Sequence, residues 1–224
     1  LHRLIRRQRQ MCIRDRIVND LKKIPVTNLF GTKPKVSIVG DLYVRDNDVF
    51  NQQLVHELEG YGAEVVTTPF TYILRMLAVK HTYSLKKEGK YLAMVRDKLL
   101  IDLLEAFEKR LFHIANEILG EEFPTFDESI FQSLEKYNLS YKHGGETSQN
   151  IMKIYSLLSH YPDLKLLIHV NPIFCCPGLV SESIFDKIEK DIGIPIVSVI
   201  YDGTMTKRNE IIVLVGDYGC GTTH

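Results

Sequence analysis

The strongest constraint on the fold is a strand–helix–strand pattern near the start of the chain. Residues 35–44, KVSIVGDLYV, are a β-branched run typical of a buried parallel strand. Residues 45–62 have helical periodicity, and residues 63–70, AEVVTTPF, predict a second strand. Two strands joined by one helix predict a parallel sheet with a right-handed crossover.

The ends of this first helix are marked by residues with known end preferences. Asp46 or Asn47 can cap its start, and Gly62 can supply its stop. Its predicted apolar face consists of Val49, Leu54, Val55 and Leu58.

The alternation returns in the second half of the chain. Residues 163–170 and 194–202 predict strands, and residues 178–191 predict the helix between them. An earlier helix, capped by Thr147 or Ser148, is expected to run to about His160. The last residues, 206–224, fit either a helix or an edge strand. The predicted fold class is α/β, with an open and mainly parallel sheet.

A helical insertion over about residues 71–137 interrupts this sheet. Residues 71–119 predict two helices divided near KKEGK at 86–90, and residues 127–137 predict another. Apolar side chains recur at spacings of three and four along the second helix, which is typical of core packing. They are Leu100, Leu104, Phe107, Leu111, Ile114 and Ile118.

Charge is distributed unevenly in a chain whose net charge is zero. Residues 1–16 hold six arginines and one acid, so the rest has 28 − 6 = 22 bases and 28 − 1 = 27 acids, or −5. That sign gives no electrostatic footprint for nucleic acid. No apolar run approaches the 18 residues of a membrane span, so we expect neither a nucleic-acid nor a membrane partner.

The basic segment 1–16 has two interpretations. It is either an arm that binds nucleic acid or an acidic surface, or non-native sequence, since RQMCIRDR resembles a translated sequencing adapter. No apolar region of signal-peptide length follows it. We expect residues 1–16 to lie outside the native fold and residues 17–224 to be a lobe of a longer protein.

The four cysteines do not form a disulfide framework. Cys12 lies in the basic segment, Cys175 and Cys176 are adjacent, and Cys220 stands alone. We therefore expect a reducing, cytoplasmic location. Pro177 suits the first turn of a helix, where backbone N–H groups favour a thiolate at Cys175 or Cys176. The pair is then a nucleophile or a metal ligand, unless both thiols are inert and buried.

Unusual residues follow three predicted strands, where ligands of open α/β sheets bind. We expect one cleft there, with the helical insertion as its wall, lined by Arg45, Asn47, Asn171, Cys175 and Asp202. The alternative interpretation is that these residues have structural roles only. Residues 46–48 can cap a helix, and residues 202–204 can form a turn. Gly144 and Gly145 lack the spacing of a nucleotide-binding loop.

Three segments carry a resemblance to a known family. They are VGDLYVRDNDVFNQQLVHELEGYGAEV, Gly145–Glu146, and NPIFCCPGLVSESIFDKIEKDIGIPIVSVIYDGT. Over roughly residues 30–210 the chain resembles the C-terminal region of activase-related proteins of the 2-hydroxyacyl-CoA dehydratase system. The most specific parts are the Cys-Cys-Pro and Tyr-Asp-Gly-Thr segments.

The resemblance implies flavodoxin-like lobes with a cysteine-ligated [4Fe–4S] cluster at their interface. Related dehydratases receive an electron from an ATP-driven activator and eliminate water from a 2-hydroxyacyl-CoA through a ketyl radical. Cys175 or Cys176 would be the cluster ligand of this lobe. The cofactor site is expected to include Arg45, Asn47, Glu146, Asn171 and Asp202.

A cluster takes several cysteine thiolates, and outside the basic segment the chain has three cysteines. The other ligands are expected from a missing N-terminal region or a partner subunit. An ATP-dependent activator and an acyl-CoA are further expected partners. The alternative function is a non-catalytic lobe that docks the activator or binds acyl-CoA, with structural cysteines.

Deleting residues 1–16 should leave the melting temperature of the chain unchanged. Their six arginines offer no apolar stripe whose burial would offset the entropy of ordering them. Thermal unfolding of the full and shortened chains tests this expectation. A drop of several degrees would show that the segment belongs to the fold.

Overall fold

The computed structural model describes most of the chain. The described residues are 13, 15–25, 32–119, 130–141, 146–210 and 212, without the side chains of 111, 114, 115 and 117–119. The chain divides into a sheet unit, residues 31–80 and 126–224, and a helical unit, residues 1–30 and 81–125. Most of the basic segment, with Cys12, and most of the C-terminal segment, with Cys220, lie outside the described residues.

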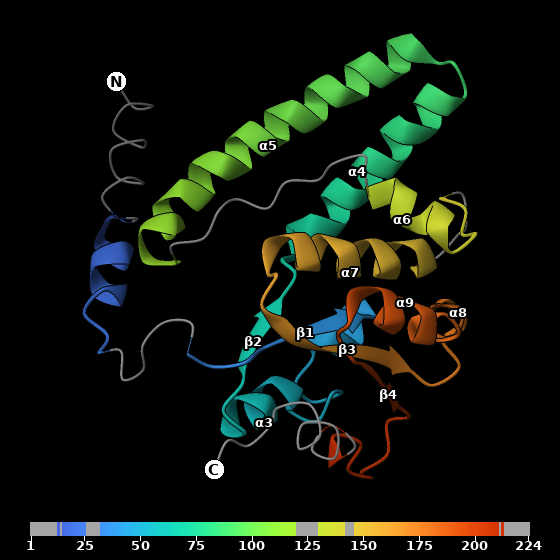
Figure 1. Ribbon diagram of the computed structural model, residues 1–224. Coiled ribbons are helices and arrows are strands. Elements are labelled where there is room, and N and C mark those ends of the chain that lie inside the picture. The colour runs from blue at the N-terminus through green and yellow to red at the C-terminus, as the bar shows by residue number, and fades with distance from the viewer. Residues whose placement is uncertain are drawn as a thin grey trace. The chain divides into compact units, whose positions relative to one another are not determined.

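Within the described residues, the sheet unit contains a four-stranded parallel sheet (Figure 1). Its strands are β1 (Lys35–Gly40), β2 (Glu64–Thr67), β3 (Leu164–Pro172) and β4 (Ile196–Tyr201). Their order is β2-β1-β3-β4. This is the order of an open, flavodoxin-like α/β sheet, so the predicted fold class is confirmed. Because all strands are parallel, their carboxyl ends meet at one edge.

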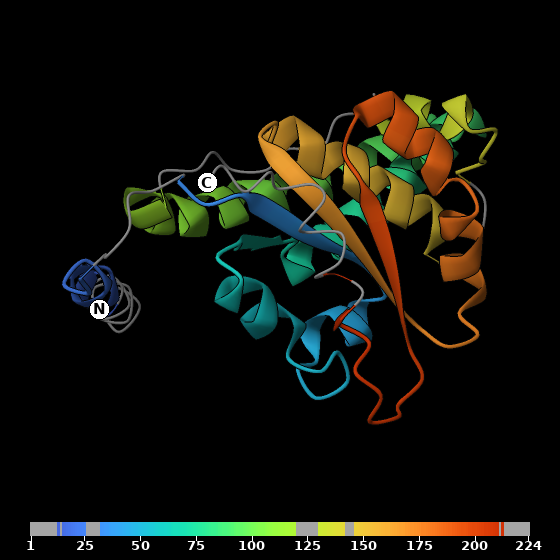
Figure 2. The same cartoon turned by 60° about the horizontal axis from the view of Figure 1, so that its bottom comes forward.

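Helices cover both faces of this sheet (Figures 1 and 2). On one face, α2 (Leu42–Asp46) and α3 (Leu54–Gly60) cover a core built from alternate strand residues such as Ile38, Ile168 and Val199. On the other face lie α7 (Thr147–His160) and α9 (Phe185–Ile192). The helices α6 (Ile130–Lys136) and α8 (Cys176–Glu182) pack against α7.

The connection after β1 differs from the prediction. The strand ends at Gly40, and Asp41 caps the short helix α2 by accepting a bond from the Val44 amide at 2.9 Å. Asn47 ends α2 and caps the turn that follows, while Val49 is 91% exposed. The prediction of one helix from residue 46 or 47 was therefore wrong, because two local caps divide the segment. Strand β2 and the positive φ of Gly62 are as expected.

Two further helix boundaries also differ. Thr147 and Ser148 are buried inside α7, and Glu146 precedes the helix without a side-chain cap. The Thr147 hydroxyl instead donates to the Pro177 carbonyl at 3.1 Å, which fixes α7 to α8. The predicted helix 178–191 is divided into α8 and α9 by the turn at 183–184.

The predicted pair of long helices is present as α4 (Phe70–Lys87) and α5 (Tyr91–Leu119), divided by Gly89 with φ +72°. The stripe on α5 is not core as predicted, because Leu100, Leu104 and Phe107 are 55–62% exposed. The side chains of Leu111, Ile114 and Ile118 lie outside the described part of the structure. Among the helices the structure describes, none combines the length and apolar character needed to cross a membrane.

Gly40→Ala should destabilise the sheet unit by about 3 kcal/mol or more. Gly40 has φ +113°, and a Cβ there would lie 2.2 Å from the Val170 carbonyl oxygen of the neighbouring strand. Gly60→Ala is the matched control, because a Cβ at Gly60 meets no atom within 4 Å. Urea unfolding of both variants measures the difference. Equal effects of the two substitutions would contradict this account of Gly40.

Candidate functional site

The strand ends bring the two cysteines and Asp202 to the same edge of the sheet. Pro172 at the end of β3 pairs with Tyr201 at the end of β4, and the Ile173 amide donates to the Tyr201 carbonyl at 2.8 Å. The chain then turns through residues 173–175 into α8, while Asp202 follows β4 directly. Cys175 and Asp202 therefore share the carboxyl edge, as the strand-end rule predicts.

The thiols stand where the chain enters α8. Cys175 precedes the helix, Cys176 is its first residue, and Pro177 lies in its first turn, as predicted. Cys175 is half-buried and Cys176 is exposed. The interpretation of both cysteines as buried packing residues is thus wrong for Cys176. A thiol at this edge is reachable by a metal, an electrophile or a second protein.

Exposed apolar side chains occur on both turns at this edge of the sheet. Ile173, Phe174 and Met205 are 46%, 84% and 97% exposed, and they lie on the turns that follow β3 and β4. Phe174 also has φ +64°, a conformation that is uncommon outside glycine. We define Ile173 and Phe174 with the two cysteines that follow them as the thiol rim. Exposed apolar groups of this kind are typical of surfaces that contact a partner.

Below the thiol rim, buried polar side chains fix α8 to the sheet. The Asn171 amide nitrogen donates to His169 Nδ1 at 3.0 Å, and both residues are buried. A Cβ at Gly178 would lie 2.4 Å from the Asn171 side chain, so α8 approaches β3 closely only because residue 178 is glycine. The Ser181 hydroxyl of α8 lies 3.4 Å from the Asn150 amide nitrogen of α7.

His169 is neutral in this network. Burial, followed by the nearby Lys153 charge, lowers the pKa of His169 to about 3. Its ring packs edge-on against Phe185 at 4.7 Å between centroids, and Ser198 and Asn150 lie within 3.5 Å of its nitrogens. A neutral imidazole both donates and accepts, which suits it to join β3, β4 and α7.

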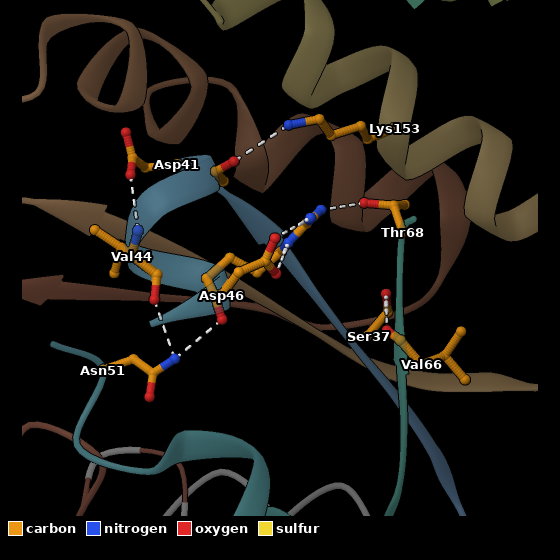
Figure 3. Close-up of polar contacts among 10 residues, drawn as sticks. Ser37, Asp41, Val44, Asp46, Asn51, Val66, Thr68 and Lys153 are labelled. Carbon is orange, nitrogen blue, oxygen red and sulfur yellow. Dashed lines mark hydrogen bonds and ion pairs between the residues drawn. The ribbon is translucent and has the colours of Figure 1, made fainter. Parts of the chain in front are cut away.

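Beside this network lies a group of buried charges (Figure 3). Arg45 is 2% exposed, and its Nε and Nη2 atoms each donate to the Asp46 carboxylate at 2.8 Å. Its Nη1 atom donates to the Thr68 hydroxyl. The Lys153 ammonium, fully buried on α7, donates to the Gly40 carbonyl at 3.2 Å. The Lys153 bond joins the end of β1 to α7, and the Arg45–Thr68 bond joins α2 to the residue after β2.

Burial shifts the pKa values of Lys153 in α7 and of Glu146, which precedes α7, in opposite directions. It lowers the pKa of Lys153 to about 8, against the attraction of Glu146 and Asp41. It raises the pKa of Glu146, against the attraction of Lys153 and Arg45. Both shifts follow from the loss of hydration of the charged form. The half-buried Glu146 and the buried Lys153 thus stabilise each other's charged form.

Asp202 stabilises the turn in which it lies, as its Asp-Gly-Thr sequence permits. Its Oδ1 atom accepts from the Thr204 hydroxyl at 2.6 Å and from the Thr204 amide at 3.0 Å, and Arg208 donates to the other oxygen. These bonds lower the pKa of Asp202 to about 2. The two bonds from Thr204 contribute most to this shift, and the bond from Arg208 contributes less. Gln52 holds the same loop by donating to the Thr206 carbonyl at 2.7 Å and accepting from the Arg208 amide at 2.9 Å.

The predicted site residues therefore fall into three groups. Cys175, Cys176, Asn171 and Asp202 follow or end β3 and β4, whereas the buried Arg45 and the half-buried Glu146 lie near Lys153. Asn47 caps a turn and has no contact that places it in either group. Gly145 lies outside the described residues, as do Cys12 and Cys220. In the part that the structure describes, no three His, Cys, Asp or Glu side chains gather as metal ligands.

Sequence reasoning missed Lys153 and His169. Lys153 lies within the apolar stretch IMKIY, and His169 lies within the strand LLIHV. Each is a single polar residue inside an apolar stretch. That pattern could have indicated a buried side chain with hydrogen-bonding partners, since polar residues are rarely buried without them.

The chain matches no family model, no curated protein and no solved structure.

Raising the pH should stabilise the chain through Lys153. Its folded pKa of about 8 lies below the ordinary 10.5, so the unfolded state binds more protons between these values. The free energy of unfolding therefore increases as the pH rises through this range, because the folded state accommodates the neutral amine more easily than the charged one. Relative to Lys153→Met, the wild-type free energy of unfolding should rise by about 2 kcal/mol from pH 7 to pH 10.

Urea unfolding at a series of pH values measures this difference. Lys187→Met on α9 is the control, because Lys187 is exposed and should show no such trend. A constant gap between the wild type and Lys153→Met would contradict the buried charge of Lys153.

Proposed function

We propose that this chain is one lobe of an iron–sulfur protein of the dehydratase-like or activase-related kind, and that Cys175 or Cys176 ligates a [4Fe–4S] cluster at an interface with another lobe. The observation that carries the proposal is the position of the two thiols. They lie at the carboxyl edge of a parallel sheet, at the start of a helix, with one thiol exposed and the other half-buried.

The chemistry of the thiol rim supports a shared cluster rather than one enclosed in this lobe. Iron–sulfur clusters take cysteine thiolates, and the described residues supply only two, which are adjacent. The remaining ligands would come from another lobe or from a partner subunit. The apolar side chains of Ile173 and Phe174 would exclude water around a cluster held between two such surfaces.

The network below the thiol rim supplies the rigidity that a ligand needs. Asn171 and Gly178 set the distance between α8 and β3, and Thr147 and Ser181 bond to the Pro177 carbonyl. The chemistry of such a protein, by its resemblance, is electron transfer to a 2-hydroxyacyl-CoA or a related substrate after activation by an ATP-driven partner.

A second function is favoured by one observation, the exposed apolar rim itself. A lobe that docks an activator or binds acyl-CoA would also expose Phe174 and Met205, and its cysteines would then be structural.

The cluster is tested in the full-length protein, purified without oxygen and assayed for iron and acid-labile sulfide. We expect Cys175→Ser or Cys176→Ser to abolish most of the cluster, because replacing a ligating thiolate by a hydroxyl removes an iron bond. Ser183→Ala, at the end of the same helix, is the matched control and should keep the iron content of the wild type.

Alkylation of the 224-residue chain provides an independent measurement. Iodoacetamide should modify the exposed Cys176 in the native, cluster-free chain, and a bound cluster in the full-length protein should protect the ligating residue. Full iron content in both cysteine variants would refute the cluster proposal. The docking lobe would then be the better account.

A further inference from the structure

Two tyrosine hydroxyls and a carboxylate are joined by hydrogen bonds in the sheet unit. Tyr137 follows α6, Tyr155 lies on α7, and Asp191 lies on α9. The two hydroxyl oxygens are 2.5 Å apart, and the Tyr137 hydroxyl donates to Asp191 Oδ2 at 2.5 Å. The Lys136 ammonium contacts the same carboxylate oxygen at 2.9 Å. We call Tyr137 and Tyr155 the tyrosine pair.

The direction of these hydrogen bonds follows from the hydrogens available. An ionised carboxylate only accepts, so the single hydroxyl hydrogen of Tyr137 points to Asp191, and Tyr155 is the donor in the bond between the two hydroxyls. The bonds from Tyr137 and then from Lys136 lower the pKa of Asp191. Burial, followed by the bond to Asp191, raises the pKa of Tyr137. At neutral pH the carboxylate is therefore ionised and the phenol is protonated.

A phenol bonded to a carboxylate is prepared to lose an electron. Removing an electron makes a phenol strongly acidic, so oxidation is easier where a base already lies within hydrogen-bonding distance of its proton. Asp191 is that base, and it is exposed, so it can pass the proton to water. Tyr201 provides the contrast, because its buried hydroxyl donates to the amide oxygen of Asn209, a much weaker base.

The second ring of the tyrosine pair lies where it can react with the first. The ring centroids are 6.3 Å apart and the ring planes are inclined by 35°. In a phenoxyl radical the unpaired electron is shared with the ortho carbons, which are bonded to the carbon that bears the oxygen. Contact between the two oxygens therefore brings an ortho carbon of each ring close together. This placement replaces a collision between two molecules by a step within one chain.

We propose that Tyr137 and Tyr155 are a site of one-electron oxidation, at which Asp191 takes the proton of Tyr137 and the two rings join as dityrosine. Each phenol loses one electron and its hydroxyl proton. The rings then bond through two ortho carbons, and the hydrogens of those carbons move to the oxygens and restore both hydroxyls. In total, two electrons pass to two equivalents of a one-electron oxidant, either an oxygen-derived radical or a high-valent metal complex, and two protons pass to water.

The product links the end of α6 covalently to α7. The new bond closes a loop over residues 137–155, and it restricts the unfolded chain as a disulfide would. We therefore expect the cross-linked chain to unfold at a higher urea concentration than the unoxidised chain. This proposal is independent of any function of the thiols.

The test is oxidation of the 224-residue chain at micromolar concentration by a photoexcited ruthenium complex and persulfate, after alkylation of its thiols. Dityrosine fluorescence measures the rate, and tandem mass spectrometry of tryptic peptides assigns the bond. We expect a bond between residues 137 and 155 within monomers, which Tyr137→Phe and Tyr155→Phe should each abolish. Tyr61→Phe removes a tyrosine that is 66% exposed and should leave this bond unchanged.

Asp191→Asn separates the proposed chemistry from proximity alone. An amide keeps an acceptor for the Tyr137 hydroxyl but is a far weaker base, so the bond between the two rings should form about tenfold more slowly. Asp186→Asn, at an exposed position of the same helix, is the matched control and should keep the wild-type rate. Circular dichroism checks that each variant is folded. Oxidation that leaves the tyrosine pair unlinked, or an unchanged rate in Asp191→Asn, would overturn the proposal.

Discussion

The carboxyl edge of the sheet depends on the close approach of Gly40 to Val170. The Asp41 amide donates to the Val170 carbonyl at 2.9 Å, so β1 stays paired with β3 until it turns into α2. This contact has no room for a Cβ at Gly40. It leaves the Gly40 carbonyl to accept from Lys153, and it places Asp41 where it caps α2. Arg45 then reaches Thr68 after β2.

Buried polar groups, rather than apolar packing alone, organise the space above this edge. A buried ammonium or guanidinium is costly unless it is paired and hydrogen-bonded. Arg45 has Asp46 and Thr68, and Lys153 has the Gly40 carbonyl with Glu146 nearby. The Arg45–Thr68 and Lys153–Gly40 bonds join elements far apart in the sequence. The contacts of Asn150 with His169 and Ser181 do the same for α7, β3 and α8.

The thiols lie at the exposed end of this rigid arrangement. Pro172 pairs with Tyr201, and α8 is bonded to α7 through the Pro177 carbonyl, so Cys175 and Cys176 stand on a turn whose two ends are fixed. A ligand or nucleophile benefits from that arrangement, because a supported side chain loses little freedom when it binds. The apolar side chains around it give the edge the character of a contact surface rather than of a closed pocket.

The sequence by itself determined the parallel α/β class, the four strands, the division of the long helices at Gly89 and the position of the cysteines before α8. Periodicity and turn residues are local properties, and they are sufficient for these features. Only the tertiary structure decided that Asp41 rather than Asp46 caps a helix, that Asn47 serves a turn, and that Lys153 and His169 are buried. The burial of Lys153 depends on its bond to Gly40, 113 residues earlier, and that of His169 on neighbours 19 and 29 residues away. The two caps are local, but several local candidates were available and the packed structure selected among them. The exposure of the leucines on α5 was likewise not predictable, because a stripe of leucines specifies an amphipathic helix but not the surface that it contacts.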